Sequence, residues 1–212
     1  MNITRVESEL SSRDAGIKHS VSLRVEQSIR KYIDEVQDVL GRIPVEDIRR
    51  VIDTLILAYL QDAHIFTLGN GGSAATASHF ANDLNKAASC DGCRRFRAIA
   101  LTDNVPLLTA WGNDLSYDDI FVEQLKNLYC DNAVVIGISG SGNSENVLRA
   151  LQFAKSRGGT TVAFTGYQGG KIKQIASASI VVPSDSMQQI EDAHLVLEHL
   201  MCTVLRQEVA CL

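Results

Sequence analysis

Two histidines and two carboxylates in this sequence are spaced so that they could form an acid–base pair or a metal site. His79 and Asp83 lie four residues apart, which puts both side chains on one face of a helix. Glu191 and His199 lie eight residues apart, which on an ideal helix is a rise of about 12 Å and a rotation of about 80°. A single pair usually belongs to a solvated helix face, but two pairs brought together could transfer protons or bind a metal ion.

A competing pair, His194 and Glu198, lies in the same C-terminal segment. Its four-residue spacing matches one helix face better than the spacing of Glu191 and His199 does. An orientation of His194 and Glu198 toward a neighbouring core is equally consistent with the sequence. Glu191 and His199 can meet one ion only if their side chains converge or the first turn of the helix is distorted. The spacing leaves both alternatives open.

A glycine-rich segment, GNGGS at residues 69–73, is a second candidate site. Glycines let the backbone turn sharply and approach a ligand, and a helix that begins here offers unpaired N–H groups to an anion. The segment lacks the GK[ST] of a Walker loop, and Ala74 stands where the dinucleotide fingerprint has its third glycine. A tight strand-to-helix turn without any ligand is an equally good interpretation.

A serine-rich segment, ISGSGNS at residues 138–144, carries the stronger signal. Three hydroxyls alternate with small residues at the predicted start of a helix. Such a turn can surround a phosphomonoester with hydroxyl donors, backbone amides and the positive end of the helix dipole. The alternative is a helix cap in which Ser144 serves only as the N-cap residue. We favour phosphate binding.

The elements that position these residues alternate along the chain. Short apolar runs predict strands at 64–69, 97–102, 133–139, 160–166 and 179–184, with near-continuous apolar character that suits strands covered on both faces. Helical periodicity marks 20–40, 45–60, 73–87, 118–129, 144–157, 171–176 and 187–208. This alternation predicts an α/β fold with a doubly wound parallel sheet, in which ligands bind beyond the carboxyl ends of the strands. Both the glycine-rich and the serine-rich segments follow predicted strands.

Length and composition fit one compact domain with an N-terminal extension. The chain has 212 residues, 45% of them hydrophobic and 21% charged, and its net charge of −5 gives no support for nucleic-acid binding. No apolar run is long enough to span a membrane, and the polar start does not resemble a signal peptide, so we expect a cytoplasmic protein. We expect a flexible tail at 1–20, N-terminal helices at 21–62 and the core at 63–212. The five cysteines are expected to be reduced and structurally incidental.

Five segments in order resemble the sugar isomerase (SIS) domain family, in particular its phosphoheptose isomerases: LGNGGSAATASHFANDL, AIALTDNVPLLTAWGNDLSYDDIF, GISGSGNSENVLRAL, TGYQGGK and IEDAHLVLEH. The resemblance covers residues 25–205. It implies a flavodoxin-like, five-stranded parallel sheet and a homotetramer with active sites between subunits. It also implies an aldose–ketose isomerase that interconverts sedoheptulose 7-phosphate and D-glycero-D-manno-heptose 7-phosphate.

The resemblance assigns roles to matching residues. Asp83 and His199 take the positions of the family's proton-transferring residues. Some members bind zinc, and the matching ligands here are His79, Asp83, Glu191 and His199, so a divalent metal is expected. The residues that match the family's sugar and phosphate contacts are Asn70, Gly71, Gly72, Ser73, Asp103, Ser139, Gly140, Ser141, Ser144 and Glu191.

Several positions depart from the family pattern. Asp83 replaces the usual glutamate and Glu191 replaces a glutamine, while Ala87 stands where an arginine contacts the substrate. Gly140 replaces a threonine of the phosphate turn. These changes leave the particular sugar open. The alternative function is a non-catalytic SIS module that senses a sugar phosphate or binds a protein partner, but the presence of both Asp83 and His199 favours the enzyme.

Overall fold

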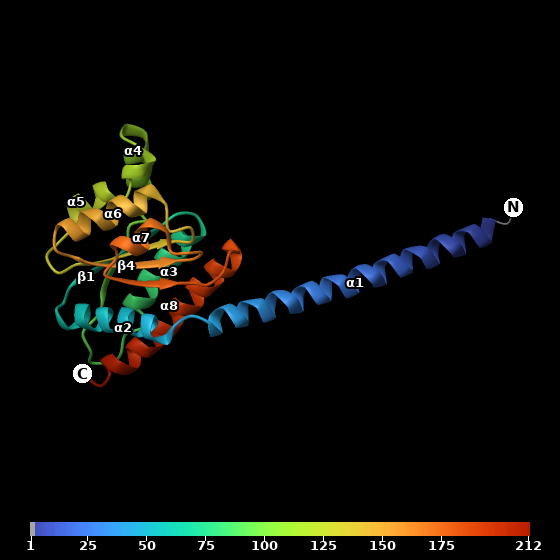
Figure 1. Ribbon diagram of the computed structural model, residues 1–212, viewed down its shortest axis with the longest axis horizontal. Helices are drawn as coiled ribbons and strands as arrows, with labels where there is room; N and C mark the ends of the chain where they lie inside the picture. Colours follow the sequence, from blue (N-terminus) through green and yellow to red (C-terminus); the bar gives the residue numbers. More distant parts are fainter. Residues whose placement is uncertain (1–2) are drawn as a thin grey trace. The chain divides into compact units, whose positions relative to one another are not determined.

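The computed structural model describes the backbone of residues 3–212 and the side chains from residue 21 onward. Two compact units make up the chain (Figure 1). The first, Met1–Gly41, contains the long helix α1 (Ile3–Gly41), and the second, Arg42–Leu212, contains all the other elements. Helix α2 (Val45–Leu60) therefore belongs to the larger unit, where it packs against α8 and β5.

A five-stranded parallel sheet forms the centre of the larger unit. Its strands are β1 (His64–Gly69), β2 (Arg97–Ala100), β3 (Val134–Ser139), β4 (Thr160–Thr165) and β5 (Ala178–Val181), in the spatial order β2-β1-β3-β4-β5. All four neighbouring pairs are parallel. Every residue of β3 is buried, as expected for a strand covered on both faces. The predicted flavodoxin-like, doubly wound sheet is confirmed.

Helices cover both faces of this sheet (Figure 1). On one face lie α2, α3 (Gly72–Asn85) and α8 (Met187–Val209), with α3 packed on β1 and β2 and α8 packed on α3. The other face carries α5 (Val122–Leu128), α6 (Glu145–Ser156) and α7 (Gly170–Ile175). Because α3 follows β1 and α6 follows β3, each helix begins at the carboxyl edge of the sheet, where the glycine-rich and serine-rich segments lie.

The close fit of α6 against the sheet depends on a glycine within β3. A Cβ atom at Gly137 would lie 2.8 Å from Val147 Cγ1 and 2.9 Å from Leu151 Cδ1, both buried residues of α6. The missing side chain therefore lets α6 approach β3 closely. This contact fixes the start of α6, and with it the serine-rich turn.

Residues 3–20, for which the sequence analysis expects a flexible tail, are helical and continue into the rest of α1; residues 1–2 lie outside the described part of the chain. Once a helix has formed, adding residues costs little, because each new residue adds a hydrogen bond without a new nucleus. No proline and only Gly16 interrupt this stretch. Because this stretch has no apolar stripe, its sequence shows no helical periodicity. Polar residues do not by themselves disfavour a helix.

Helix α4 (Val105–Asp114) was not predicted from the apolar periodicity of the sequence, and none of its residues is fully buried. Its start carries a recognisable signal: the Leu107 N–H donates to Asn104 Oδ1 at 3.2 Å, and Pro106 stands in the first turn. A short 3₁₀ helix, η1 (Tyr117–Asp119), follows it. Only Leu108 and Trp111 of this helix pack, half-buried, against the core, and two apolar residues are too few to show helical periodicity in the sequence.

The expectation for the cysteines is wrong at one pair. Cys90 and Cys93 form a disulfide, with their Cα atoms 5.4 Å apart, while Cys130, Cys202 and Cys211 are free. The loop after α3 brings the two Cα atoms within the separation that a disulfide requires. In the described residues we find no helix that is both long and apolar enough to cross a bilayer.

Candidate active site

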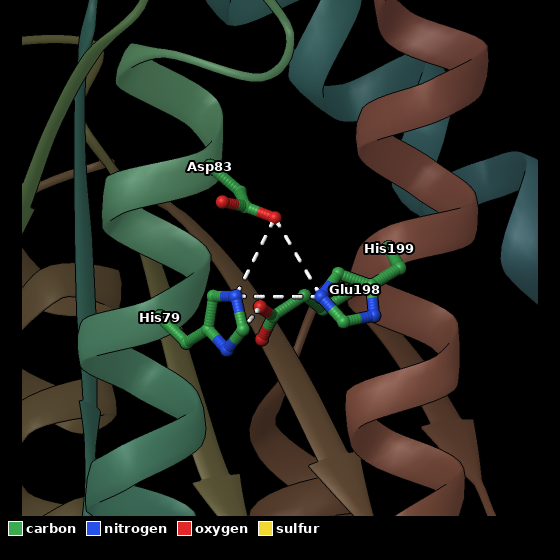
Figure 2. Close-up of side chains that lie close together, drawn as sticks. All are labelled: His79, Asp83, Glu198 and His199. Atoms are coloured by element: carbon green, nitrogen blue, oxygen red, sulfur yellow. Dashed lines mark hydrogen bonds and ion pairs between the residues drawn. The ribbon is translucent and has the colours of Figure 1, made fainter.

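Two helices that are far apart in the sequence lie side by side and present four polar side chains to one another (Figure 2). His79 and Asp83 are one turn apart on α3. Glu198 and His199 come from α8. One ligand atom from each of the four residues lies within 4.8 Å of the others.

Three of these atoms form a compact triangle. The Nε2 atoms of His79 and His199 are 3.3 Å apart, and Asp83 Oδ2 lies 3.7 Å from each of them (Figure 2). Ligand atoms bound tetrahedrally to zinc at 2.0–2.2 Å lie about 3.3–3.6 Å from one another. The triangle therefore fits a divalent ion held by two imidazoles and one carboxylate, with a further position left for another ligand.

The triangle opens into a cleft. Asp83 and His199 both line a cavity of about 800 Å³, together with residues of the last turns of α8 and with Cys90 of the disulfide loop. The side chain of His199 is 50% exposed, and that of His79, which does not line the cavity, is 43% exposed. A carboxylate and an imidazole thus face one space from separate helices, as acid–base catalysis requires.

Glu198 is the member of the cluster that sequence reasoning did not select. Its side chain is fully buried, and neither of its carboxylate oxygens has a hydrogen-bond partner. Its nearest polar contact is His79 Nδ1, 3.5 Å from Oε1, which is an ion-pair distance. Burial, and secondarily the charge of Asp83, raises the pKa of Glu198 to about 8.

Glu191 does not join this cluster. Its carboxylate oxygens lie against Gly72, in the space that a Cβ atom on that glycine would fill. Glu191 is about two turns from His199 on α8, so it reaches the start of α3, whereas His199 faces the middle of that helix. The structure therefore brings together His79, Asp83 and His199 of the predicted metal set, with Glu198 in the fourth place.

His194 is oriented toward the core, which is one of the two alternatives that the sequence left open. It is fully buried, and Thr165 O lies 3.2 Å from its Nε2, which we assign as the protonated nitrogen. Burial lowers the pKa of His194 to about 4. His194 is a neutral core residue, so the pair His194 and Glu198 does not act as one unit.

The glycine-rich loop joins β1 to α3 and is tied to the serine-rich side of the sheet. Gly71, at φ +55°, is the N-cap of α3, a backbone conformation that favours glycine. Asn70 and Asn146 exchange two amide hydrogen bonds of 2.8 and 2.9 Å. Tyr117 OH donates to Asn70 Oδ1 at 2.8 Å. Ser73 is buried, and Gly72 faces Glu191 as described above.

The serine-rich turn brings its hydroxyls together at the start of α6. Ser139 Oγ lies 3.1 Å from Ser144 Oγ and 3.5 Å from Ser141 Oγ. Ser144 occupies the N-cap position but makes no side-chain cap hydrogen bond, so its hydroxyl faces the other serines rather than the helix. The side chain of Met187 lies against Gly140, so any side chain at this position would require Met187 to move. Three hydroxyls around a helix start form a suitable site for an anion.

Asp103 lies elsewhere, at the end of β2. It accepts hydrogen bonds from the hydroxyls of Ser78 and Thr102. It lines a second cavity of about 680 Å³ that also contains Asn82 and Asn85. The structure thus places Asp103 beside α3, but not in the triangle of His79, Asp83 and His199.

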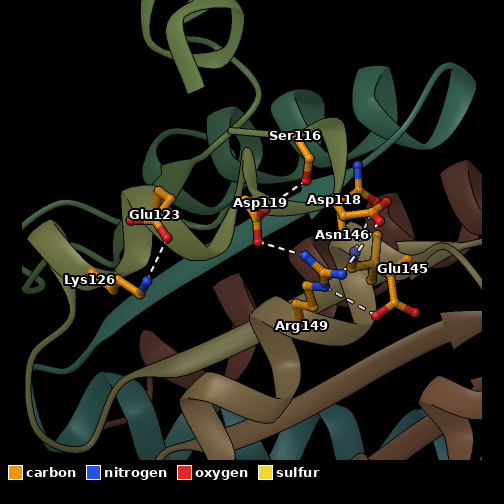
Figure 3. A network of polar contacts seen from close by, with 9 residues as sticks. Ser116, Asp118, Asp119, Glu123, Lys126, Glu145, Asn146 and Arg149 are labelled. Atoms are coloured by element: carbon orange, nitrogen blue, oxygen red, sulfur yellow. Dashed lines mark hydrogen bonds and ion pairs between the residues drawn. The ribbon is translucent and has the colours of Figure 1, made fainter. Parts of the chain in front are cut away.

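An ion-pair network holds η1 against α6 (Figure 3). The guanidinium of Arg149 lies 2.7 Å from Asp119, 3.5 Å from Asp118 and 3.2 Å from Glu145. The hydroxyl of Ser116 and then Arg149 hold the pKa of Asp119 below its usual value. Because η1 carries Tyr117, this network supports the contact of Tyr117 with Asn70. Sequence reasoning missed Tyr117 and Asn146, which have no motif of their own.

Comparisons with known proteins identify the family to which the chain belongs. The family model described as "SIS domain" matches residues 31–166. A phosphoheptose isomerase of Aquifex aeolicus is 39% identical over 86% of this chain and 88% of its own length.

Solved structures give the same assignment. The phosphoheptose isomerase GmhA of Neisseria gonorrhoeae superposes with a TM-score of 0.80 at 31% identity, over 86% of this chain and 99% of that one. A phosphoheptose isomerase from Francisella tularensis has a TM-score of 0.79 at 27% identity, over 88% and 98% of the two chains. The chain therefore belongs to the SIS domain family, and within it to the phosphoheptose isomerases.

Proposed function

We propose that this protein is an aldose–ketose isomerase that interconverts sedoheptulose 7-phosphate and D-glycero-D-manno-heptose 7-phosphate. The observation that carries this proposal is the pairing of Asp83 and His199 across one cleft, with 3.7 Å between Oδ2 and Nε2. The relatives named as phosphoheptose isomerases support the same reaction. A second support is the hydroxyl cluster of the serine-rich turn, which suits the phosphate.

The reaction moves a proton between C1 and C2 of the sugar through an enediol. From the ketose, the carboxylate of Asp83 removes a proton from C1 while His199 gives a proton to the carbonyl oxygen on C2. His199 then recovers a proton from the hydroxyl on C1, and Asp83 returns its proton to C2, which leaves an aldose. One carboxylate and one imidazole are sufficient for both steps, because each group ends in the state in which it began.

The phosphate anchors the far end of the substrate. Ser139, Ser141 and Ser144 supply hydroxyl donors, and the Gly140 amide and the start of α6 add further attraction for an anion. The sugar contacts are assigned to Asn70, Gly71, Gly72 and Ser73 of the glycine-rich loop, with Asp103 and Glu191 beside α3. Binding energy at these remote groups positions the reacting carbons and so contributes to the rate.

The metal is proposed to be zinc, with His79, Asp83 and His199 as its protein ligands. The donor set of two nitrogens and one oxygen, with the spacing described above, fits this ion. A bound divalent ion polarises a sugar carbonyl and stabilises negative charge on its oxygen. A ligating carboxylate is a weaker base, and an imidazole nitrogen bound to a metal ion cannot carry the transferred proton. We therefore rank proton transfer above metal binding as the role of both Asp83 and His199.

The assembly is proposed to be a cytoplasmic homotetramer with active sites between subunits. Helix α1 supports this proposal, since a stripe of large apolar side chains on it is 43–55% exposed in the single chain: Val21, Val25, Ile29 and Ile33. Side chains of this kind usually mark a contact with another protein surface.

The function is tested with purified protein and sedoheptulose 7-phosphate in deuterated water, followed by NMR. The wild type is expected to form the aldose and to exchange the proton at C1. Asp83→Asn and His199→Ala are expected to lower kcat by at least about 10²- to 10⁴-fold, because each variant loses one proton-transfer group. Asp131→Asn, an exposed carboxylate before β3, is the control and should keep full activity.

Two results would contradict the proposal. Tight binding of the sugar phosphate without proton exchange would instead identify a sensor. Full activity of His199→Ala would remove His199 from the reaction.

A further inference from the structure

Glu198 is a buried acid that the proton transfers do not use. Its side chain has no exposed surface, and both of its oxygens lack a hydrogen-bond partner among the described residues. A carboxyl group in such a place loses its hydration without a replacement, which costs free energy unless another group compensates. The position of Glu198 therefore requires an explanation in terms of its neighbours.

The neighbour that it faces is the ring nitrogen of His79 that points away from the triangle. His79 directs Nε2 toward Asp83 and His199, and its Nδ1 lies 3.5 Å from Glu198 Oε1 (Figure 2). Nε2 of His79 thus faces the triangle, and Nδ1 of the same ring faces Glu198. Histidines that bind a metal commonly donate their other N–H to a carboxylate, which fixes the tautomer and the ring orientation.

We propose that Glu198 is a positioning residue for the metal site: Oε1 of its carboxyl group accepts a hydrogen bond from Nδ1–H of His79 and so presents Nε2 to the ion. This inference rests on the metal site of the proposed function, but not on the identity of the sugar. Glu198 differs from the three ligands in its exposure to solvent. The side chains of His79, His199 and Asp83 are 43%, 50% and 15% exposed, whereas that of Glu198 is fully buried.

The first test measures metal affinity without any substrate. Glu198→Leu removes the acceptor, and it is expected to weaken Zn²⁺ binding about 10- to 100-fold in competition with a chelating dye. Glu198→Gln keeps an acceptor oxygen in the same place, so it should retain more affinity than the leucine variant. Glu208→Leu, the same substitution at an exposed carboxylate on α8, is the matched control and should bind as the wild type does.

A second measurement separates a positioning residue from a direct ligand. With Co²⁺ in place of zinc, the visible absorption spectrum of Glu198→Leu should keep the shape of the wild-type spectrum, because the three ligands are unchanged. His79→Ala, which removes a ligand, should alter that spectrum. A spectrum of Glu198→Leu that changes as His79→Ala does would make Glu198 a ligand and overturn the proposal.

The tautomer of His79 is measured on the unaltered protein, which removes any dependence on the folding of the variants. In the zinc-loaded protein, ¹H–¹⁵N correlation spectra should show the proton of His79 on Nδ1. A proton on Nε2, an affinity of Glu198→Leu within twofold of the wild type, or no zinc binding by the wild type would each overturn the inference. Isomerase activity without bound metal would still support the proposed reaction. Failure of the inference about Glu198 can therefore be distinguished from failure of the proposed function.

Discussion

At the scale of single residues, burial decides which of the titratable groups on α8 can take part in chemistry. His194 and His199 are five residues apart on one helix, yet one is enclosed in the core and the other is half exposed in the cleft. A buried imidazole that stays neutral near pH 7 contributes packing and one hydrogen bond to the Thr165 carbonyl. An accessible imidazole beside a carboxylate can exchange protons with a ligand.

The buried state of His194 predicts how stability depends on pH. Its pKa is about 4 in the folded protein and about 6.5 in the unfolded chain. Between these values the unfolded chain binds the additional proton, so stability is full above pH 6.5 and falls as the pH drops toward 4. The difference amounts to about 3 kcal/mol of unfolding free energy.

Urea unfolding at a series of pH values checks this prediction. Glu198, whose pKa is raised, acts in the opposite direction, and other carboxylates also titrate in this range. The wild type is therefore compared with His194→Leu, which lacks only the one imidazole. The variant should lose less stability than the wild type between pH 6.5 and 4, and parallel curves would contradict the prediction.

At the scale of elements, the junction of β1 and α3 depends on a glycine because a side chain at this position would meet backbone atoms. A Cβ atom at Gly69 would lie 2.6 Å from the carbonyl oxygen of Ser73 and 2.9 Å from that of Ile138. Both obstacles are backbone atoms, which cannot rotate away as a side chain can. The first turn of α3 is thereby held directly against β3.

Gly69→Ala is therefore expected to lower the unfolding free energy by about 1–3 kcal/mol or more, because the backbone of β1, α3 or β3 must shift. It should also reduce isomerase activity, since the displaced segment carries the glycine-rich loop. Chemical denaturation and steady-state kinetics measure the two effects. Gly41→Ala, where a Cβ atom meets nothing within 4 Å, is the control; equal stability of the two variants would contradict the argument.

The elements also explain what the sequence could reveal. Five apolar runs predicted the five strands, because strands covered on both faces need continuous apolar character. Helix α4 packs only the half-buried Leu108 and Trp111 against the core and has no fully buried residue, so its sequence gave no periodic signal. Helical spacing alone could not decide between Glu191 and Glu198, since that choice depends on how α8 is rotated against α3. Rotation between two helices is a property of packing, and no short stretch of sequence encodes it.

At the scale of the whole molecule, the exposed apolar stripe of α1 predicts self-association. Chromatography with light scattering should give a mass near four times the 23.1 kDa of one chain. Replacing Ile29 and Ile33, which are 55% and 50% exposed, with glutamate should produce smaller species, because charges would enter the apolar contact. Lys31→Glu, also on α1, is the control. A monomeric wild type would contradict the proposed assembly.

The reciprocal amide pair between Asn70 and Asn146 has a mechanical consequence. It couples the loop after β1 to the first turn of the helix after β3. A movement of either segment is therefore transmitted to the other. The serine-rich turn, proposed to bind the phosphate, and the glycine-rich loop, proposed to contact the sugar, are therefore expected to move together as one unit.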